Sequence, residues 1–462
     1  MRTRLLHLWE VLTSSYWFVP AVMMAAAVVL AMVMLSIDQT YGRSIQKIGW
    51  FYAGGADGAR ALLATIAASI ITVAGIVFSI TIATLTQASS QFGPRLLRNF
   101  MRDTGNQITL GTFVATFIFC VLILRSVQGE NAEGWVPHAS VTAAVVLSLL
   151  SIVVLIYFIH HVSLSLQAPI VVAAVAHDLE QAIRSHFPGE IGAEAPTVEQ
   201  EADACRTAED VLALGCAVAS ARDGYIQAID QENVMDEAVE HDLVIRLALR
   251  PGDYAVEGAP LMHVLPADRC DREMAERLRA MFILGRQRTA EQDVEFAIDQ
   301  LVEIAVRALS PAVNDPFTAV QCVDRLASSL RELAHNDLLS PYRFDAHGRP
   351  RVITPVSTWA GFVDAAFNQI RQYGRGSVAV TLRLLEVIAA IAPQMKTELH
   401  RAPLLRQAEM IQRQARRSIE EEHDLADVEQ RFHAARQALL SGVTEPSRAH
   451  ASLPRASPRA PA

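Results

Sequence analysis

Polar side chains recur at helical spacing in several parts of the chain, and three such sets are candidates for chemistry. The first lies inside a long uncharged apolar run, where hydroxyl side chains return every seven residues and so share one stripe of a helix. This hydroxyl stripe consists of Thr65, Thr72, Ser79 and Thr86, with Ser69 between their rows. A polar stripe avoids lipid. It therefore either packs against another helix through small residues or lines a water-filled path.

The second set lies between Gly285 and Arg307, in the densest polar stretch of the later part of the chain. Its charged and amide side chains are spaced so that several of them share one helix face. The residues are Arg286, Arg288, Gln292, Asp293, Asp299 and Arg307. One interpretation is a solvated face held by ordinary ion pairs. The other is a polar site in which Arg286 and Arg288 hold an anion or a phosphate.

The third set follows Pro94, which suits the first turn of a helix. Arg95, Arg98 and Arg102 fall on one side of the predicted helix, and apolar side chains fall on the other. This pattern is typical of a helix that lies in the membrane interface with its arginines toward lipid headgroups. The alternative is an arginine cluster that contacts anions beside an ion path.

The elements that position the first set are membrane spans. Four apolar runs predict a transmembrane domain over residues 1–166, with spans at about 17–37, 61–85, 108–124 and 139–166. The apolar part of the second span would be about 38 Å long as a helix, which exceeds the roughly 30 Å of a bilayer core. Four spans return the chain to its starting side. The five cysteines form no CxxC pair, which fits a reducing compartment, so we expect both termini in the cytoplasm.

The elements that position the second set belong to a cytoplasmic α+β part. We expect a helical exit and linker at 167–202, a small β unit at 203–268, a helical domain at 269–442 and a disordered tail at 443–462. The β unit looks like the core of biotinyl or lipoyl carriers, but no lysine lies between Lys47 and Lys396, which excludes a swinging arm. The predicted fold class is a mainly α membrane protein with four transmembrane helices and a cytoplasmic part that contains a small β-sandwich-like unit.

Several function classes find no support in the chain. The formal net charge of -9 shows no basic footprint for nucleic acid. No glycine-rich phosphate loop, nucleophile elbow, HExxH pair or CxxC pair occurs, so we expect no metal, no cofactor and no catalytic residue. An enzyme is therefore not favoured, and would need a site in the stretch from Arg286 to Arg307.

Several stretches together resemble a known family. They are Phe78-Ser79, the run from Ser89 to Arg95, Gly224 to Gln227, Arg250 to Asp253, GRQRTAEQD from Gly285, and ALSPAVNDPFTA from Ala308. In this order they are similar to the predicted bacterial membrane proteins called domain of unknown function 2254. The resemblance implies an integral protein of the bacterial inner membrane. It brings no assigned activity, ligand or catalytic residue.

Two functions remain in view. The first is a homo-oligomeric channel or transport protein in which the second span lines a path through the bilayer. The second is a membrane-anchored sensor or scaffold that binds a small-molecule ligand or a partner through its cytoplasmic domain. The two differ in where the hydroxyl stripe lies: on the axis of an assembly, or buried inside a single bundle.

Overall fold

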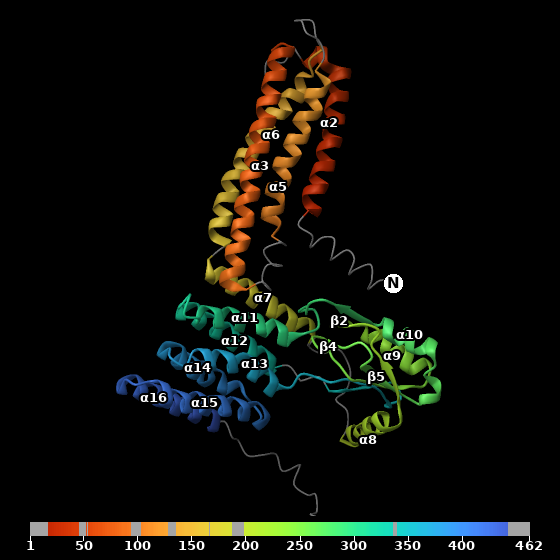
Figure 1. Cartoon of the computed structure of the whole chain (residues 1–462), viewed down its shortest axis with the longest axis vertical. Helices are drawn as coiled ribbons and strands as arrows, with labels where there is room; N and C mark the ends of the chain where they lie inside the picture. Colours follow the sequence, from red (N-terminus) through yellow and green to blue (C-terminus); the bar gives the residue numbers. More distant parts are fainter. Residues whose placement is uncertain are drawn as a thin grey trace, which may run out of the picture. The chain divides into compact units, whose positions relative to one another are not determined.

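The computed structural model describes residues 17–45, 52, 54–93, 103–127, 135–165, 167–186, 198–335 and 340–441. The chain divides into two compact units, Met1–Val171 and Val172–Ala462 (Figure 1). The first unit is a bundle of long apolar helices. The second combines two small sheets with a stack of helices.

Four described helices of the first unit are long and apolar enough to cross a membrane. They are α2 (Phe18–Ile45), α3 (Ala56–Phe92), α5 (Thr104–Ser126) and α6 (His138–Ser165). The four spans predicted from the sequence are therefore confirmed as helices. With 37 residues, α3 is the longest. Its length of about 55 Å exceeds the roughly 30 Å of a bilayer core, so only part of α3 can lie in hydrocarbon.

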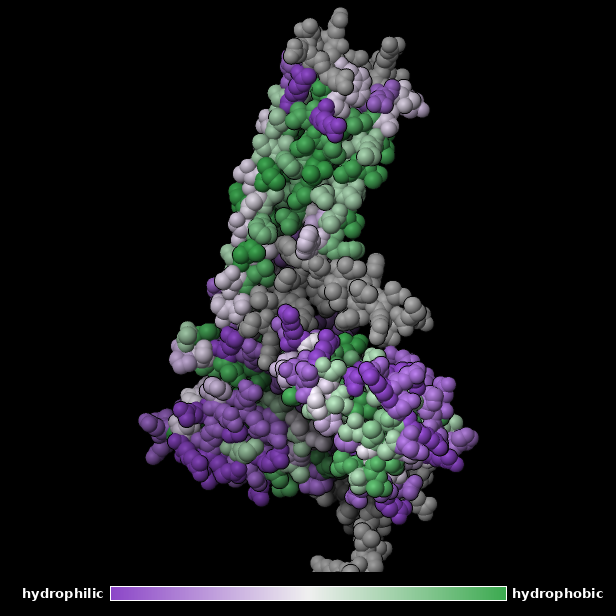
Figure 2. Space-filling view, turned by 45° about the vertical axis from the view of Figure 1, so that its right-hand side comes forward, coloured by the Kyte–Doolittle hydropathy of each residue, from purple (hydrophilic) through white to green (hydrophobic). Residues whose placement is uncertain are grey.

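Helix α5 is the centre of this bundle, because it packs against α2, α3 and α6. In the most apolar stretch of α5, 50% of the residues are buried, whereas only 17% are buried in the corresponding stretches of α2 and α6. Side chains at the centre include Leu63, Phe119, Ile123 and Val141, and a second cluster lies around Phe113 and Phe158. Figure 2 shows the apolar side chains that cover the outside of the bundle.

The start of α6 is fixed by a carboxylate from another helix. Asp38 lies near the end of α2 and is almost completely buried, with 2% of it exposed. Its Oδ1 accepts a hydrogen bond from Ala139 N at 2.8 Å, and its Oδ2 accepts bonds from Ser140 N at 2.9 Å and Ser140 Oγ at 2.6 Å. Asp38 thus satisfies amide groups that have no partner within the first turn of α6.

The second unit contains two sheets whose strands come from distant parts of the sequence. The five-stranded sheet has the order β1-β5-β3-β8-β7, and the three-stranded sheet has the order β4-β2-β6. The strands are β1 (Cys216–Ala219), β2 (Gly224–Ile229), β3 (Val244–Leu247), β4 (Tyr254–Ala255), β5 (Pro260–Leu265), β6 (Phe282–Gly285), β7 (Tyr342–Phe344) and β8 (Pro350–Ile353). All pairs are antiparallel except β3 with β8. One cluster that includes Ile226, Ile245, Met262 and Phe282 packs the two sheets together.

Short helices connect and cover these strands (Figure 1). They are α8 (Val198–Leu214), α9 (Gln231–Glu240), η2 (Ala267–Arg269) and α10 (Arg272–Ala280). Helix α8 contacts β3, β5 and β8 of the five-stranded sheet, and α10 lies along β1 and β6. The core of this β region includes Val234 and Ala238 of α9 and Leu278 of α10.

The rest of the second unit is a stack of antiparallel helices. It contains α11 (Val294–Ala308), α12 (Pro316–His335), α13 (Trp359–Tyr373), α14 (Val378–Ile391), α15 (Glu398–Ser418) and α16 (Glu422–Leu440). Helices α11, α13 and α15 pack in one row, and α12, α14 and α16 pack in a second row beside it. The preceding helix α7 (Ala168–His186) joins this stack through an ion pair of Arg184 with Glu332 of α12, 3.1 Å long.

Strands β1 to β5 all lie between Gly215 and Leu265, inside the stretch where the sequence predicts a small β unit. The structure adds β6, β7 and β8 within the stretch that the sequence marked as helical, because these short strands extend sheets that begin earlier in the chain. Strands β6 and β7 are edges, and β8 lies between β3 and β7. Asp315 caps the start of α12, since its Oδ1 accepts a hydrogen bond from Thr318 N at 3.1 Å. The stretch from Thr397 to Leu440 forms the helix pair α15 and α16, within the predicted helical domain.

Candidate functional sites

The hydroxyl stripe lies on the outside of the four-helix bundle. Its five members are exposed, and the opposite side of α3 is buried against the other helices. The buried side includes Leu63, Ala67, Ile70, Ala74 and Val77. Within one copy of the chain, the stripe is therefore not an internal packing surface.

Each hydroxyl of the seven-residue repeat donates a hydrogen bond within its own helix. Thr65, Thr72, Ser79 and Thr86 donate to carbonyl oxygens four residues earlier, at distances of 2.7, 2.8, 2.8 and 2.9 Å. Ser69 is exposed on the same side. Because the donors are satisfied locally, the face can meet another helix without unpaired groups, while the oxygen lone pairs can still accept bonds from water.

The third set of candidates cannot be located in the same way. Arg95, Arg98 and Arg102 lie outside the described residues, so their contact with headgroups or anions stays a prediction. Helix α3 ends just before them, at Phe92, with Gly93 as its C-cap.

A polar pair that the sequence did not single out joins α5 to α6. Asp103 is the N-cap of α5, where its Oδ1 accepts a bond from Gly105 N at 2.8 Å. Its Oδ2 lies 2.6 Å from Nε2 of His161, and the His161 ring stacks on Tyr157. The signal in the sequence was an aspartate directly before one span and a histidine near the end of the next, which meet because the two helices are antiparallel.

In the second unit, Arg288, Asp293 and Asp299 form one charged cluster. The Arg288 guanidinium lies 2.7 Å from Asp293 Oδ2 and donates to Asp299 Oδ2 at 3.1 Å. Its carbon lies 5.1 Å from the centre of the Phe296 ring. Burial raises the pKa of Asp293, and the positive charge of Arg288 opposes that shift. Burial alone would lower the pKa of Arg288, but the two carboxylates raise it.

This cluster also begins a helix. Asp293 is the N-cap of α11, and its Oδ1 accepts a bond from Phe296 N at 3.0 Å. Only 6% of Asp293 is exposed. The three nitrogens of Arg288 all face carboxylates. This geometry favours the ion-pair interpretation, and anion binding by Arg286 and Arg288 stays a prediction.

A second ion pair lies beside the first and uses a residue from the RPGD turn. Arg250 donates to both oxygens of Glu295, at 3.1 and 2.7 Å, and also to Ser357 Oγ. Gly252 of the same turn, with φ of 94°, lies against the Asp293 carboxylate. The RPGD and GRQRTAEQD stretches, separated in sequence, therefore form one joint between the sheets and the helical stack.

The remaining predicted residues separate into different environments. Gln292 pairs with the backbone of Ile229 at the end of β2, accepting from its N at 2.9 Å and donating to its O at 3.2 Å. Arg307 pairs with Glu303 one turn away, at 3.2 Å. Arg286 is exposed. Spacing alone missed Arg250 and Gly252, because the turn that carries them meets α11 only in the folded protein.

Among the described residues, no group of three or more histidine, cysteine, aspartate or glutamate side chains could hold a metal ion. In the joint, each guanidinium faces carboxylates: Arg288 faces Asp293 and Asp299, and Arg250 faces Glu295. The arrangement is suited to fixing the β region on the helical stack.

Comparisons with known proteins agree with this architecture. A family model described as a predicted membrane protein, DUF2254, matches residues 13–390. An uncharacterised protein of Mycobacterium bovis and uncharacterised proteins of two Mycobacterium tuberculosis strains are each 30% identical over 425 residues. Each match covers 91% of this chain and 80% of the relative. No solved structure matches. The chain belongs to the DUF2254 family of predicted membrane proteins.

Proposed function

We propose that this membrane protein assembles from several copies, and that the hydroxyl stripes of their α3 helices line a path for ions or small solutes. The single observation that carries the proposal is the position of the stripe. Its hydroxyls point out of the four-helix bundle of one copy, although they belong to a helix that is apolar enough to cross a membrane.

The positions of two other polar pairs in the same bundle support this proposal. Asp38 and Ser140 are buried and bonded to each other across two helices. Thr116 and Ser151 are buried and lie 3.1 Å apart. Polar groups in spans ordinarily face the bundle or water rather than lipid. We infer that a second copy or a water-filled path covers the outward stripe of α3.

The same proposal includes a location and an orientation. We place the protein in the bacterial inner membrane with both termini in the cytoplasm. The four candidate spans among the described residues would place both termini on the same side of the membrane, and the lack of a CxxC pair in the sequence fits a reducing compartment on that side. A reporter that is active only in the periplasm, fused at the C-terminus, tests the orientation, and activity there would contradict it.

The test of the path uses cysteine substitutions on α3 after the native cysteines are replaced, Cys120 in particular. Thr72→Cys and Ser79→Cys should react with a small membrane-impermeant thiol reagent, because only a thiolate formed in water reacts. The matched control is Phe78→Cys, since Phe78 is also exposed (48%) but lies off the stripe. Equal reactivity at all three positions, or at none, would contradict a path along the stripe.

A flux measurement separates a path from a packing surface. Replacing Thr72 and Ser79 with leucine should block ion flux into liposomes while the assembly stays intact on size-exclusion chromatography. Loss of assembly together with unreactive cysteines would instead assign the stripe to helix packing between copies.

The second candidate function is a membrane-anchored sensor or scaffold, and the helical stack favours it. Stacked helix pairs create extended surfaces that bind partners. Two large apolar side chains on this stack, Phe317 and Leu399, are 79% and 77% exposed. If liposomes containing the purified protein show no flux, while Phe317→Ser removes binding of a defined partner, the scaffold function replaces the channel.

A further inference from the structure

Two cysteines that are far apart in the sequence meet at the edge of the five-stranded sheet. Cys216 is the first residue of β1, which is an edge strand, and Cys270 directly follows η2. Cys216 lies opposite Val264 of β5, and Cys270 ends the short turn that follows β5, so the chain brings both cysteines to the same end of the sheet. The neighbouring Cys216 also contributes to the raised pKa of Cys270. Both are free cysteines and both are partly exposed.

The path of the chain explains why they meet. Cys216 pairs with Val264 near the end of β5, and the chain then turns through η2 to Cys270. Helix α10 follows and lies along β1, where Arg279 Nε donates to Ala219 O at 2.9 Å. The segment that begins at Cys270 therefore returns to β1, the strand whose first residue is Cys216.

We propose that Cys216 and Cys270 are a site of reversible thiol oxidation, at which a peroxide converts the two thiols into a disulfide. The bond would attach edge strand β1 covalently to the connection between β5 and α10. A loop of roughly 50 residues would be closed, and such loops restrict the unfolded chain substantially. The proposal is independent of any path through the membrane.

The chemistry needs only the two thiols and the peroxide. The Cys216 thiolate attacks one peroxide oxygen and breaks the O–O bond, which leaves a sulfenic acid on Cys216 and releases water after protonation. The Cys270 sulfur then attacks the Cys216 sulfur, forms the S–S bond and releases the second water. The two thiols lose two electrons in total, and the peroxide is reduced to two waters.

The surroundings assign the order of these steps. Burial raises the pKa of Cys270 to about 11, and the neighbouring Cys216 and Asp271 add to the shift. Cys270 is therefore almost entirely protonated near neutral pH and is a poor first nucleophile. Cys216 is the residue that meets the peroxide, and Cys270 resolves the sulfenic acid.

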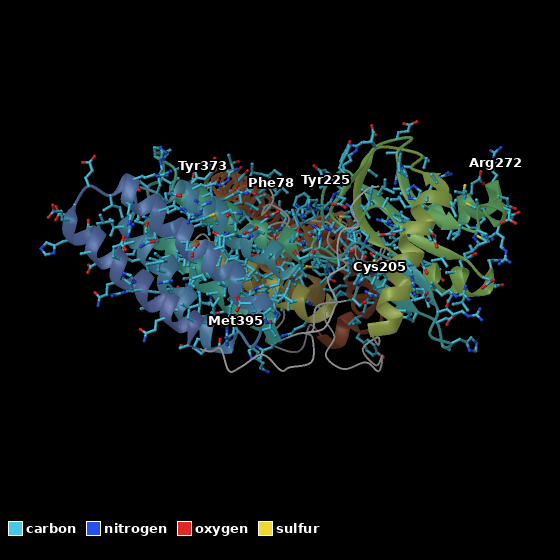
Figure 3. The ribbon with its side chains drawn as sticks, turned by 90° about the horizontal axis from the view of Figure 1, so that it is seen from below. Phe78, Cys205, Tyr225, Arg272, Tyr373 and Met395 are labelled. Atoms are coloured by element: carbon cyan, nitrogen blue, oxygen red, sulfur yellow. The ribbon has the colours of Figure 1, made fainter. Side chains whose placement is uncertain are left out.

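The other described cysteines are not alternatives for this pairing. Cys120 and Cys322 are buried in helices α5 and α12. Cys205 is exposed on α8, and Figure 3 separates it clearly from Arg272, which lies two residues after Cys270. Cys205 therefore serves as an internal control, because it is accessible to oxidants but lies away from the connection that carries Cys270.

The experiment uses the full-length protein in detergent, treated with hydrogen peroxide, alkylated and digested with trypsin. Cleavage after Arg206, Arg222, Arg269 and Arg272 places the two cysteines in peptides 207–222 and 270–272. We expect these peptides to appear linked after peroxide and separate after reduction. The Cys205→Ser variant should give the same linked product, and Cys270→Ser should abolish it and leave Cys216 as a sulfenic acid.

The opposite result is equally clear. Recovery of both peptides as separate alkylated species, under peroxide that oxidises Cys205, would overturn the proposal. A disulfide that joins Cys216 to Cys205 in place of Cys270 would also overturn it.

Discussion

Gly252 lies directly against the carboxylate of Asp293, so a turn of the β region contacts the start of α11 in the helical stack. A Cβ atom at Gly252 would lie 2.7 Å from Asp293 Cγ, and the backbone there has φ of 94°. Only glycine meets both conditions easily, because it has no side chain and tolerates positive φ.

The first prediction follows from this contact. Gly252→Ala should destabilise the second unit by about 2–4 kcal/mol, because it combines backbone strain with displacement of a buried carboxylate. The matched control is Gly258→Ala, since Gly258 also has positive φ, 81°, but has open space around its Cβ position. Thermal unfolding should show a clearly larger drop in the midpoint for Gly252→Ala. Equal drops would mean that strain alone acts and that the contact contributes nothing.

The second prediction concerns the bidentate pair of Arg250 and Glu295. A double-mutant cycle with Arg250→Gln and Glu295→Gln should give a coupling energy of about 1–2 kcal/mol, because the pair is partly buried and well aligned. The control cycle uses Arg272 and Glu276, whose side chains are 94% and 59% exposed. Exposed pairs contribute about 0.5 kcal/mol or less. Denaturant unfolding measures both cycles. Similar coupling energies in the two cycles would mean that the Arg250–Glu295 pair does not stabilise the joint.

The third prediction concerns pH. Hydrogen bonds from Arg351 and Arg269 lower the pKa of Asp242. Burial would raise the pKa of Asp345, but bonds from Arg349 N, His347 N and Arg351 outweigh it and lower this pKa too. A carboxyl with a lowered folded-state pKa stabilises the fold above its unfolded value of about 3.9, and this contribution is lost as the pH falls through the folded-state value.

The melting midpoint of the second unit should therefore fall steeply as the pH drops below about 4. Arg351→Gln, which removes the shared cation, should lower the midpoint at neutral pH and make the acid dependence shallower. Arg272→Gln, on an exposed pair, should leave the slope unchanged. An unchanged slope in Arg351→Gln would show that other carboxylates set the acid limit.

The fourth prediction concerns Asp38, which caps α6 from α2. Asp38→Ala should destabilise the helical bundle by about 1–2 kcal/mol, the usual cost of losing an N-cap. Asp57→Ala is the control, because Asp57 pairs with Arg60 through a largely exposed side chain. Unfolding of the bundle in denaturing detergent, followed by circular dichroism, measures the difference. A neutral result for Asp38→Ala would mean that water replaces the cap without loss.

Local sequence patterns were sufficient for several features. The four spans follow from long apolar runs, because a helix in lipid must satisfy its backbone internally and carry apolar side chains. The turn at Gly252 and the cap at Asp315 follow from residue chemistry within a few positions. The strands β1 to β5 follow from alternation and turn residues over short windows.

The charged stretch from Arg286 to Arg307 shows where local reasoning ends. Spacing correctly placed Asp299, Glu303 and Arg307 along one helix, but it could not supply the partners that come from elsewhere. Arg250 meets Glu295 across a long sequence separation, and Gln292 meets the end of β2. Strand β8 is similar: its partner β3 lies about a hundred residues earlier, and no local period encodes that pairing.

The sequence by itself determined that this is a four-span membrane protein with an α+β part, because apolar run length and periodicity are properties of single elements. Only the tertiary structure decided which side of α3 is buried. A helix with small side chains on one face and branched side chains on another can pack with either face toward the bundle. It also decided that Cys216 meets Cys270 and that Gly252 meets Asp293, since such meetings depend on how separate elements pack, which no single stretch of sequence records.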